Sequence, residues 1–210
     1  LVDRGLNHIP WSTTNGIRVT NVTPELMSAL KNAGCYRVYF GVESGVQRVI
    51  DSIGKNISLE QVKYAVRVAK EVGLEVGLYF MLGNLGETAE DMEQTIRCAI
   101  ELDPDLVQFT IATPYPGTEM YRRVTSEGRL LVNTWAEFAS YEGLIFECEG
   151  VIPEVVNRKH REALRRFYLR PRFILRQTRQ LTSWSGVRRA LRSSHALLGL
   201  LLRQEKRQSS

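Results

Sequence analysis

LEVGLYFML, residues 74–82, is a run in which nearly every side chain is apolar. A strand with one face in water alternates apolar and polar residues, whereas a nearly continuous apolar run is typical of a strand covered on both faces. Two comparable runs flank it, YRVYFGV at residues 36–42 and LVQFTIA at residues 106–112. Their β-branched and aromatic residues favour strands. The sequence therefore predicts three strands, and residues 74–82 are expected to be covered on both faces.

Helices are expected between these strands, because the intervening stretches have helical periodicity and begin with capping residues. Thr23 followed by Pro24 is a typical helix start, and Gly34 is a typical helix stop. The expected helices are residues 24–33, 46–53, 59–72, 88–102 and 118–127, and a short first strand is expected over residues 17–19. This alternation predicts an α/β fold with a parallel sheet, either an open doubly wound sheet or part of a (β/α) barrel.

The C-terminal part of the chain differs from the rest in charge. Residues 157–207 hold 15 Lys and Arg but two acidic residues, although the net charge of the whole chain is +5. Pro171 interrupts a helical pattern and predicts a break there. Residues 187–203 are expected to form one more amphipathic helix, followed by a disordered end. We therefore divide the chain into a body, residues 1–130, and a basic, mainly helical extension, residues 131–210.

Composition excludes several classes of protein. With 210 residues and 43% hydrophobic content the chain can bury a core, so disorder is not expected over most of it. No apolar run reaches the roughly 18 residues that cross a bilayer, and the N-terminus lacks a signal-peptide pattern, so the sequence predicts a cytoplasmic protein. Because the chain starts with Leu1 rather than Met, we expect it to be a piece of a longer protein.

The cysteines and histidines suggest no local site. Cys35, Cys98 and Cys148 are far apart, which matches neither a disulfide framework nor a local metal site, so reduced thiols are expected. No residue of this chain is predicted to bind a metal. The three histidines are scattered as well, and no Ser/His/Asp set or carboxylate pair stands out, so no catalytic residue is predicted.

The candidate site lies where the strands end, because ligands of parallel α/β folds bind at the carboxyl ends of the strands. Glu43, directly after residues 36–42, either accepts hydrogen bonds from a ligand or caps the next helix. Residues 83–88, GNLGET, form a glycine-rich turn before a helix but match neither a P-loop nor the dinucleotide fingerprint. Residues 112–118, ATPYPGT, form either a rigid loop suited to a flat heterocycle or an ordinary turn.

Taken together, four stretches resemble the radical S-adenosylmethionine (SAM) superfamily: WSTTNGIRV, ELMSALKNAGCYRVYFGVESGVQRVIDSIGK, VGLYFMLGNLGETAEDMEQTIRCAI and TPYPGTEMY. They occur in the order and spacing typical of that superfamily, over residues 1–130. The resemblance is strongest to the branch of anaerobic magnesium-protoporphyrin ester cyclases and related methyltransferases, in which an N-terminal cobalamin-binding domain is common. RRFYLRPRFILRQ, residues 165–177, resembles the C-terminal extension of that branch.

The resemblance implies a partial parallel (β/α) barrel of radical SAM type with a C-terminal α-helical extension, and it implies an enzyme. In that superfamily a CxxxCxxC loop holds a [4Fe–4S] cluster that binds and cleaves SAM, giving a radical that abstracts hydrogen from a substrate. This chain has no such loop, which family order places before Leu1, so the fragment alone is expected to be inactive. The implied cofactors are SAM, the cluster and, as a candidate, cobalamin. The implied partners are a small-molecule substrate and an electron donor such as flavodoxin or ferredoxin.

The resemblance also assigns expected SAM contacts. Glu43 and Ser44 match a strand-end pair that contacts the ribose or amino end of SAM, and Arg18 matches a strand residue that faces its carboxylate. Residues Met81 to Gly83 match the strand that flanks the adenine, and residues Ile111 to Thr113 match the backbone that hydrogen-bonds it.

Three further positions refine these expectations. Cys35 resembles a structural cysteine of the branch and is not assigned to the cluster. Leu85 stands where the family usually has proline, which predicts a looser turn. Glu87 is expected at a helix N-terminus, where its carboxylate meets the amides of its own helix.

Two other functions fit parts of the sequence. A barrel of aldolase or decarboxylase type would usually show a strand-end lysine or a phosphate site, and neither is evident. The basic C-terminal residues would attract the phosphates of a nucleic acid. However, arginines that flank apolar runs such as ALLGLLL favour a helical face that packs on the barrel or on a membrane surface. We therefore do not expect nucleic acid as a partner, and a membrane surface is a candidate. The substrate itself is not identified by the sequence.

Overall fold

The computed structural model describes residues 1–132, 134–140 and 143–179. The chain forms two compact units, Leu1–Phe167 and a second unit that begins at Tyr168. The predicted division at residue 130 stays a prediction. The described elements are two 3₁₀ turns, η1 (Val2–Arg4) and η2 (Val19–Asn21), the strands β1 (Trp11–Ser12), β2 (Cys35–Glu43), β3 (Glu75–Leu82), β4 (Leu106–Ile111), β5 (Arg129–Leu130) and β6 (Phe146–Glu147), and the helices α1 (Pro24–Asn32), α2 (Gln47–Ser52), α3 (Leu59–Glu71), α4 (Ala89–Leu102), α5 (Glu119–Glu127), α6 (Trp135–Ser140), α7 (Pro153–Tyr168) and α8 (Pro171–Arg179).

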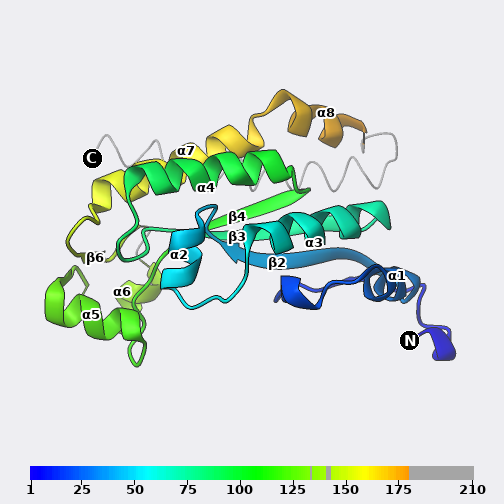
Figure 1. Cartoon of the computed structure of the whole chain (residues 1–210), viewed down its shortest axis with the longest axis horizontal. Coiled ribbons are helices and arrows are strands. Elements are labelled where there is room, and N and C mark those ends of the chain that lie inside the picture. The colour runs from blue at the N-terminus through cyan, green and yellow to red at the C-terminus, as the bar shows by residue number, and fades with distance from the viewer. Residues whose placement is uncertain (133, 141–142, 180–210) are drawn as a thin grey trace. The chain divides into compact units, whose positions relative to one another are not determined.

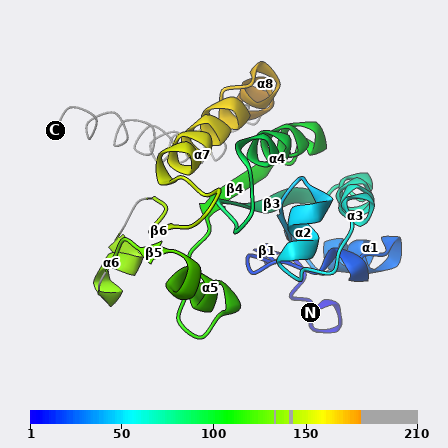
Figure 2. The same ribbon diagram turned by 60° about the vertical axis from the view of Figure 1, so that its left-hand side comes forward.

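The strands β1, β2, β3 and β4 form one parallel sheet in that order. Figure 1 shows β2, β3 and β4 next to one another. Glu43 at the end of β2 pairs with Phe80, and Leu82 at the end of β3 pairs with Ile111, so these three strands end at one edge. The helices α1, α3 and α4 pack against the strands (Figure 2). The predicted α/β fold with a parallel sheet is confirmed, and the sheet is a half-barrel in which each long strand is followed by a helix.

The two faces of the sheet differ in polarity and burial. One face packs under the helices and is made of fully buried apolar side chains, namely Val38, Phe40, Val42, Val76, Leu78, Phe80 and Leu82. The opposite face carries Arg37, Tyr39, Tyr79 and Met81, which are only half-buried. The rings of Tyr39 and Tyr79 stack there with centroids 5.2 Å apart. The apolar run at residues 74–82 is thus covered by helices on one face, whereas we expected cover on both.

The predicted first strand is wrong in its position. Trp11–Ser12 is the strand that pairs with β2, whereas Ile17 makes one isolated parallel bridge with Phe40. Gly16 adopts φ 85°, a left-handed turn conformation that favours glycine and interrupts the ladder between these two pairings. Val19 then begins a 3₁₀ turn instead of continuing a strand.

The region beyond residue 128 contains both confirmed and unforeseen features. The predicted break at Pro171 is confirmed, because α7 ends at Tyr168 and α8 begins at Pro171. The antiparallel pair β5–β6 had no counterpart in the prediction. The helix expected over residues 187–203 and the end expected to be disordered lie outside the described residues. No helix within the described ranges is both long and apolar enough to cross a lipid bilayer.

Candidate functional site

The carboxyl ends of β2, β3 and β4 bring Glu43, Gly83 and Thr113 to the same edge of the sheet. This grouping was predicted, and the parallel register confirms it. The strands are about 4.8 Å apart in such a sheet, so the ends of β2 and β4 lie on the order of 10 Å from each other. A ligand of the size of a nucleoside can span that distance.

An ion pair lies at the end of β2. The carboxylate of Glu43 is 2.5 Å from the ammonium of Lys55, and their side chains are 21% and 34% exposed. Glu43 has φ 69°, an uncommon conformation for a residue other than glycine. A Cβ on Gly41 would lie 2.9 Å from both the Glu43 oxygen and the Lys55 nitrogen, so the ends of these two side chains lie directly over the glycine. Both charged groups are thus partly exposed to solvent.

Lys55 was missed by the sequence analysis. It belongs to the loop between α2 and α3, 12 residues after Glu43, so inspecting only the residues next to each strand could not find it. The one sequence feature that could have indicated Lys55 is its position in the short loop between α2 and α3, the two helices that follow β2.

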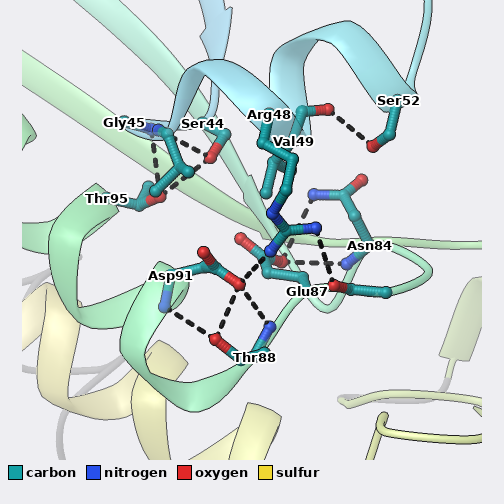
Figure 3. Close-up of polar contacts among 12 residues, drawn as sticks. Ser44, Gly45, Arg48, Val49, Ser52, Asn84, Glu87, Thr88, Asp91 and Thr95 are labelled. Carbon is teal, nitrogen blue, oxygen red and sulfur yellow. Dashed lines mark hydrogen bonds and ion pairs between the residues drawn. The ribbon is translucent and has the colours of Figure 1, made fainter.

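Ser44 and Gly45 anchor this strand end to α4 (Figure 3). Ser44 is fully buried, and its hydroxyl is 3.0 Å from the hydroxyl of Thr95. The amide of Gly45 donates to the same Thr95 oxygen at 3.0 Å. A Cβ on Gly45 would approach the Cβ of Cys98 to 2.6 Å, so α4 packs directly on the glycine backbone. The predicted contact between Ser44 and SAM stays a prediction, and the hydroxyl group here serves the contact with α4.

Glu87 folds back into the turn that follows β3. Its Oε2 accepts hydrogen bonds from the amides of Gly83 at 2.7 Å and Asn84 at 2.9 Å. The side chain is 1% exposed, and its Oε1 is buried with no hydrogen-bond partner among the described residues. Burial raises the pKa of Glu87 to about 7, against the lowering effect of the hydrogen bonds from Asn84 and Gly83. The expectation that Glu87 meets the amides of its own helix is wrong, because those amides are capped by another pair.

Thr88 and Asp91 form that capping pair at the start of α4. The Thr88 hydroxyl accepts from the Asp91 amide, and the Asp91 carboxylate accepts from the Thr88 amide at 2.7 Å. Arg48 of α2 reaches across to the same carboxylate at 2.5 Å and donates to the Gly86 carbonyl at 3.2 Å (Figure 3). Partial burial raises the pKa of Asp91, but the hydrogen bonds from Thr88 and Arg48 outweigh it and lower that pKa. These contacts hold α2, the turn and α4 as one rigid group.

The other residues predicted to contact SAM lie partly at the edge of the sheet and partly away from it. Met81 lies on the half-buried face of the sheet, directly before the strand end. Ile111 ends β4, and its carbonyl accepts from the Thr113 hydroxyl at 3.2 Å. Gly83 turns with φ 84°, and a Cβ there would approach Val156 of α7 to 2.9 Å. Arg18 is not a strand residue, contrary to the prediction, because it is exposed at the start of η2.

The described residues do not form a site for an iron–sulfur cluster. Cys35, Cys98 and Cys148 are free thiols on β2, on α4 and directly after β6. Among the described residues no three His, Cys, Asp or Glu side chains gather closely enough to hold a metal ion. Cys35 is buried, with its thiol 3.3 Å from the Arg37 carbonyl. Burial also raises the pKa of Cys98 to about 11, which keeps that thiol protonated.

Residues 12–99, which include the sheet edge with Glu43, Lys55 and Glu87, match the sequence model of the Radical SAM superfamily. This segment of the chain is therefore similar to the radical SAM superfamily.

Particular relatives refine this placement. An uncharacterized methyltransferase of Pyrococcus horikoshii is 36% identical over 80% of this chain and 36% of its own length. The anaerobic magnesium-protoporphyrin IX monomethyl ester cyclase of Rubrivivax gelatinosus is 29% identical over 51% of this chain and 20% of its own length. The chain thus spans about a third or less of these curated relatives. Among solved structures, the radical SAM methyltransferase TsrM of Kitasatospora setae matches 60% of this chain and 25% of its own chain with a TM-score of 0.51 at 21% identity, which shows a shared fold.

Proposed function

We propose that this chain is the part of a radical SAM enzyme that holds SAM against the edge of the half-barrel. The observation that carries the proposal is the Glu43–Lys55 ion pair, which lies over Gly41 at the end of β2 inside the segment that matches the superfamily. The Glu43 carboxylate can pair with the ammonium group of an amino acid, and the neighbouring Lys55 ammonium can pair with its carboxylate. This arrangement fits the methionine end of SAM.

The other parts of SAM are assigned to the neighbouring strand ends. Lys55 is proposed to hold the carboxylate of SAM, and Glu43 its amino group or ribose. Met81 supplies an apolar surface for the adenine, and the backbone of residues 111–113 supplies hydrogen bonds to its edge. Ser44 is proposed to hold Glu43 in place through Thr95, since its hydroxyl group is already bonded there.

The residues described do not fit the cluster itself, so we propose that its cysteine ligands belong to a segment outside this chain. When bound, a [4Fe–4S] cluster supplies the electron that cleaves SAM. A small protein electron donor such as flavodoxin or ferredoxin is the proposed source of that electron. The chain on its own is then inactive.

The names of the relatives guide the choice of reaction. One relative is described as a methyltransferase and another as a cyclase of magnesium-protoporphyrin monomethyl ester. We therefore propose methyl transfer or cyclisation on a small-molecule substrate, with cobalamin as a candidate second cofactor because TsrM was solved with cobalamin bound. A cytoplasmic location is proposed for the enzyme. A membrane surface is the proposed partner of the basic C-terminal extension.

Substitution of the ion pair tests the proposal. Lys55→Ala and Glu43→Ala should each weaken SAM binding to the cluster-loaded full-length enzyme roughly tenfold to a hundredfold, because each removes a charge-assisted hydrogen bond of about 1.5–3 kcal/mol. Glu87→Ala should weaken it less, since Glu87 bonds the turn rather than the ligand. Calorimetric titration with SAM measures all three.

Lys63→Ala is the matched control. It removes the same charge from an exposed lysine of α3 that pairs with Glu60 on the same helix. SAM affinity for Lys55→Ala and Glu43→Ala equal to that of the control would sink the assignment of the site. Failure of the unsubstituted enzyme to bind SAM at all would sink the proposed function.

A further inference from the structure

The second unit exposes large aliphatic side chains at the start of α8. Leu169, Ile174 and Leu175 are 51%, 48% and 55% exposed. An open hollow of about 620 Å³ lies beside them, lined by Pro171, Arg172, Ile174 and Leu175. Exposed aliphatic groups that gather in one place and are rimmed by charged residues mark an interaction surface rather than ordinary solvent exposure. We call residues 169–176 the α8 patch.

The sequence that contains the α8 patch carries charges of one sign. Residues 168–204 contain eight arginines and no Asp, Glu or Lys. Arg172 of the patch is exposed, and the guanidinium of Arg176 lies 5.7 Å from the centre of the Phe173 ring. This segment therefore has a net positive charge. Arginine also binds phosphate through two parallel hydrogen bonds, which lysine cannot do.

We propose that the α8 patch binds the surface of an anionic lipid membrane. In this arrangement the arginines contact lipid phosphates, and Ile174 and Leu175 enter the boundary between headgroups and acyl chains. The helix does not span the membrane, since its nine residues are far fewer than the roughly 20 required. The proposal is independent of the radical chemistry proposed above.

The aliphatic groups favour a membrane over a nucleic acid. Both partners offer phosphates to the arginines, but single-stranded nucleic acids are bound largely by stacking bases on exposed aromatic rings. The two aromatic residues described in this unit, Tyr168 and Phe173, pack edge to face on one another with centroids 5.1 Å apart, and Phe173 is 6% exposed. Ile174 and Leu175 are removed from water only by an apolar surface, which of these two partners only the membrane provides.

Vesicle binding of the whole chain tests the proposal. The probes are vesicles of phosphatidylcholine alone and of phosphatidylcholine with about a third phosphatidylserine, compared by flotation at about 0.1 M salt, where surface charges still attract within a Debye length of about 10 Å. The chain should bind the mixed vesicles and not the neutral ones. Equal binding to both kinds, or binding to neither, would overturn the proposal.

An aliphatic double variant tests insertion. Ile174→Ser with Leu175→Ser should weaken binding to the mixed vesicles at least about tenfold, because apolar area no longer enters the lipid. The matched control is Leu6→Ser with Ile9→Ser, which removes two aliphatic groups that are 37% and 50% exposed in the first unit. Equal losses in the two double variants would overturn the proposal. Thermal midpoints within a degree of the unsubstituted chain show that both variants are folded.

A charge variant and two competing partners complete the experiment. Arg172→Gln should weaken vesicle binding roughly fivefold, while Arg122→Gln on α5 should not change it. Tight binding of a short RNA that survives the Ile174/Leu175 substitutions, without vesicle binding, would instead establish a nucleic-acid surface. A dimer in analytical ultracentrifugation that those substitutions abolish, without vesicle binding, would establish self-association. Either result would overturn the proposal.

Discussion

At the scale of single residues, Glu87 shows how a buried carboxyl group can hold a turn. Its Oε2 accepts both amides of the Gly83–Asn84 peptide segment, so it replaces hydrogen bonds that a turn with a left-handed glycine leaves unmade. The other oxygen has no hydrogen-bond partner in the described structure. The turn that carries Gly83 to the sheet edge therefore depends on a group that is costly to keep ionised.

The ionisation of Glu87 predicts a specific pH dependence of stability. Its pKa is about 7 in the folded chain and about 4.3 in an unfolded chain, so the folded state binds the proton more tightly. Stability from this group is fully present below about pH 4 and is lost as pH rises through 7, by roughly 3 kcal/mol in total. Glu87→Gln keeps the shape of the side chain without its charge. As pH rises from 5 to 8, the stability of the variant should therefore increase relative to that of the unsubstituted chain. Urea unfolding at both pH values measures this, and a constant difference between the two proteins would contradict it.

At the scale of elements, α7 is fixed to the sheet and to α4 by polar contacts as well as by packing. The carboxylate of Glu93 on α4 pairs with Lys159 at 2.9 Å and with Arg166 at 2.8 Å. The ring of His160 is 2.9 Å from the Phe109 carbonyl of β4, and Val156 packs against Gly83. Burial lowers the pKa of His160, which favours its neutral ring. Helix α7, which lies beyond the predicted body, is thereby part of the compact unit that contains the sheet edge.

The Glu93 ion pairs predict a loss of stability at low pH. Partial burial raises the pKa of Glu93, but hydrogen bonds from Lys159 and Arg166 outweigh it and lower that pKa to about 2. A lowered pKa means that the stabilisation is present above about pH 4.5 and disappears as pH falls toward 2. Glu93→Gln should therefore cost about 2 kcal/mol at pH 7 and almost nothing near pH 2.

Glu90→Gln on the same helix is the control, because Glu90 is exposed. It should change the free energy of unfolding by less than about 0.5 kcal/mol at either pH. Urea unfolding at pH 7 and pH 2 measures both variants. A cost for Glu93→Gln that stays the same at the two pH values would show that packing, and not the ion pairs, holds α7.

At the scale of the whole molecule, the half-barrel lacks a loop that could hold a cluster within the described residues. The three thiols lie on separate elements, and burial raises the pKa of both Cys35 and Cys98, which disfavours the thiolate form that iron requires. The 210-residue chain alone should therefore fail to take up a stoichiometric [4Fe–4S] cluster under anaerobic reconstitution. Iron and sulfide content with the visible absorption spectrum measure this. A stoichiometric cluster that is lost in Cys35→Ala would show that the ligands do lie in this chain.

The sequence by itself determined the order of strands and helices. Local patterns carry this information, because an apolar run, a capping box such as Ser58 with Gln61, and glycine stops act over a few residues. Parallel strands also end at one edge, so the grouping of Glu43, Gly83 and Thr113 followed from the order of elements alone. The strand predicted over residues 17–19 failed because a turn at Gly16 overrides a short β-branched stretch.

Only the tertiary structure decided which partner each site residue meets. The sequence could not show that Lys55 reaches Glu43, because α2 lies between them in the chain and its folding back brings the loop to the strand end. A glutamate before a helix cap also looks the same in sequence whether it points into solvent or into a turn, and burial alone distinguishes Glu87. Periodicity and caps depend on neighbours along the chain, whereas charge pairs and burial depend on which elements lie side by side once the sheet has formed.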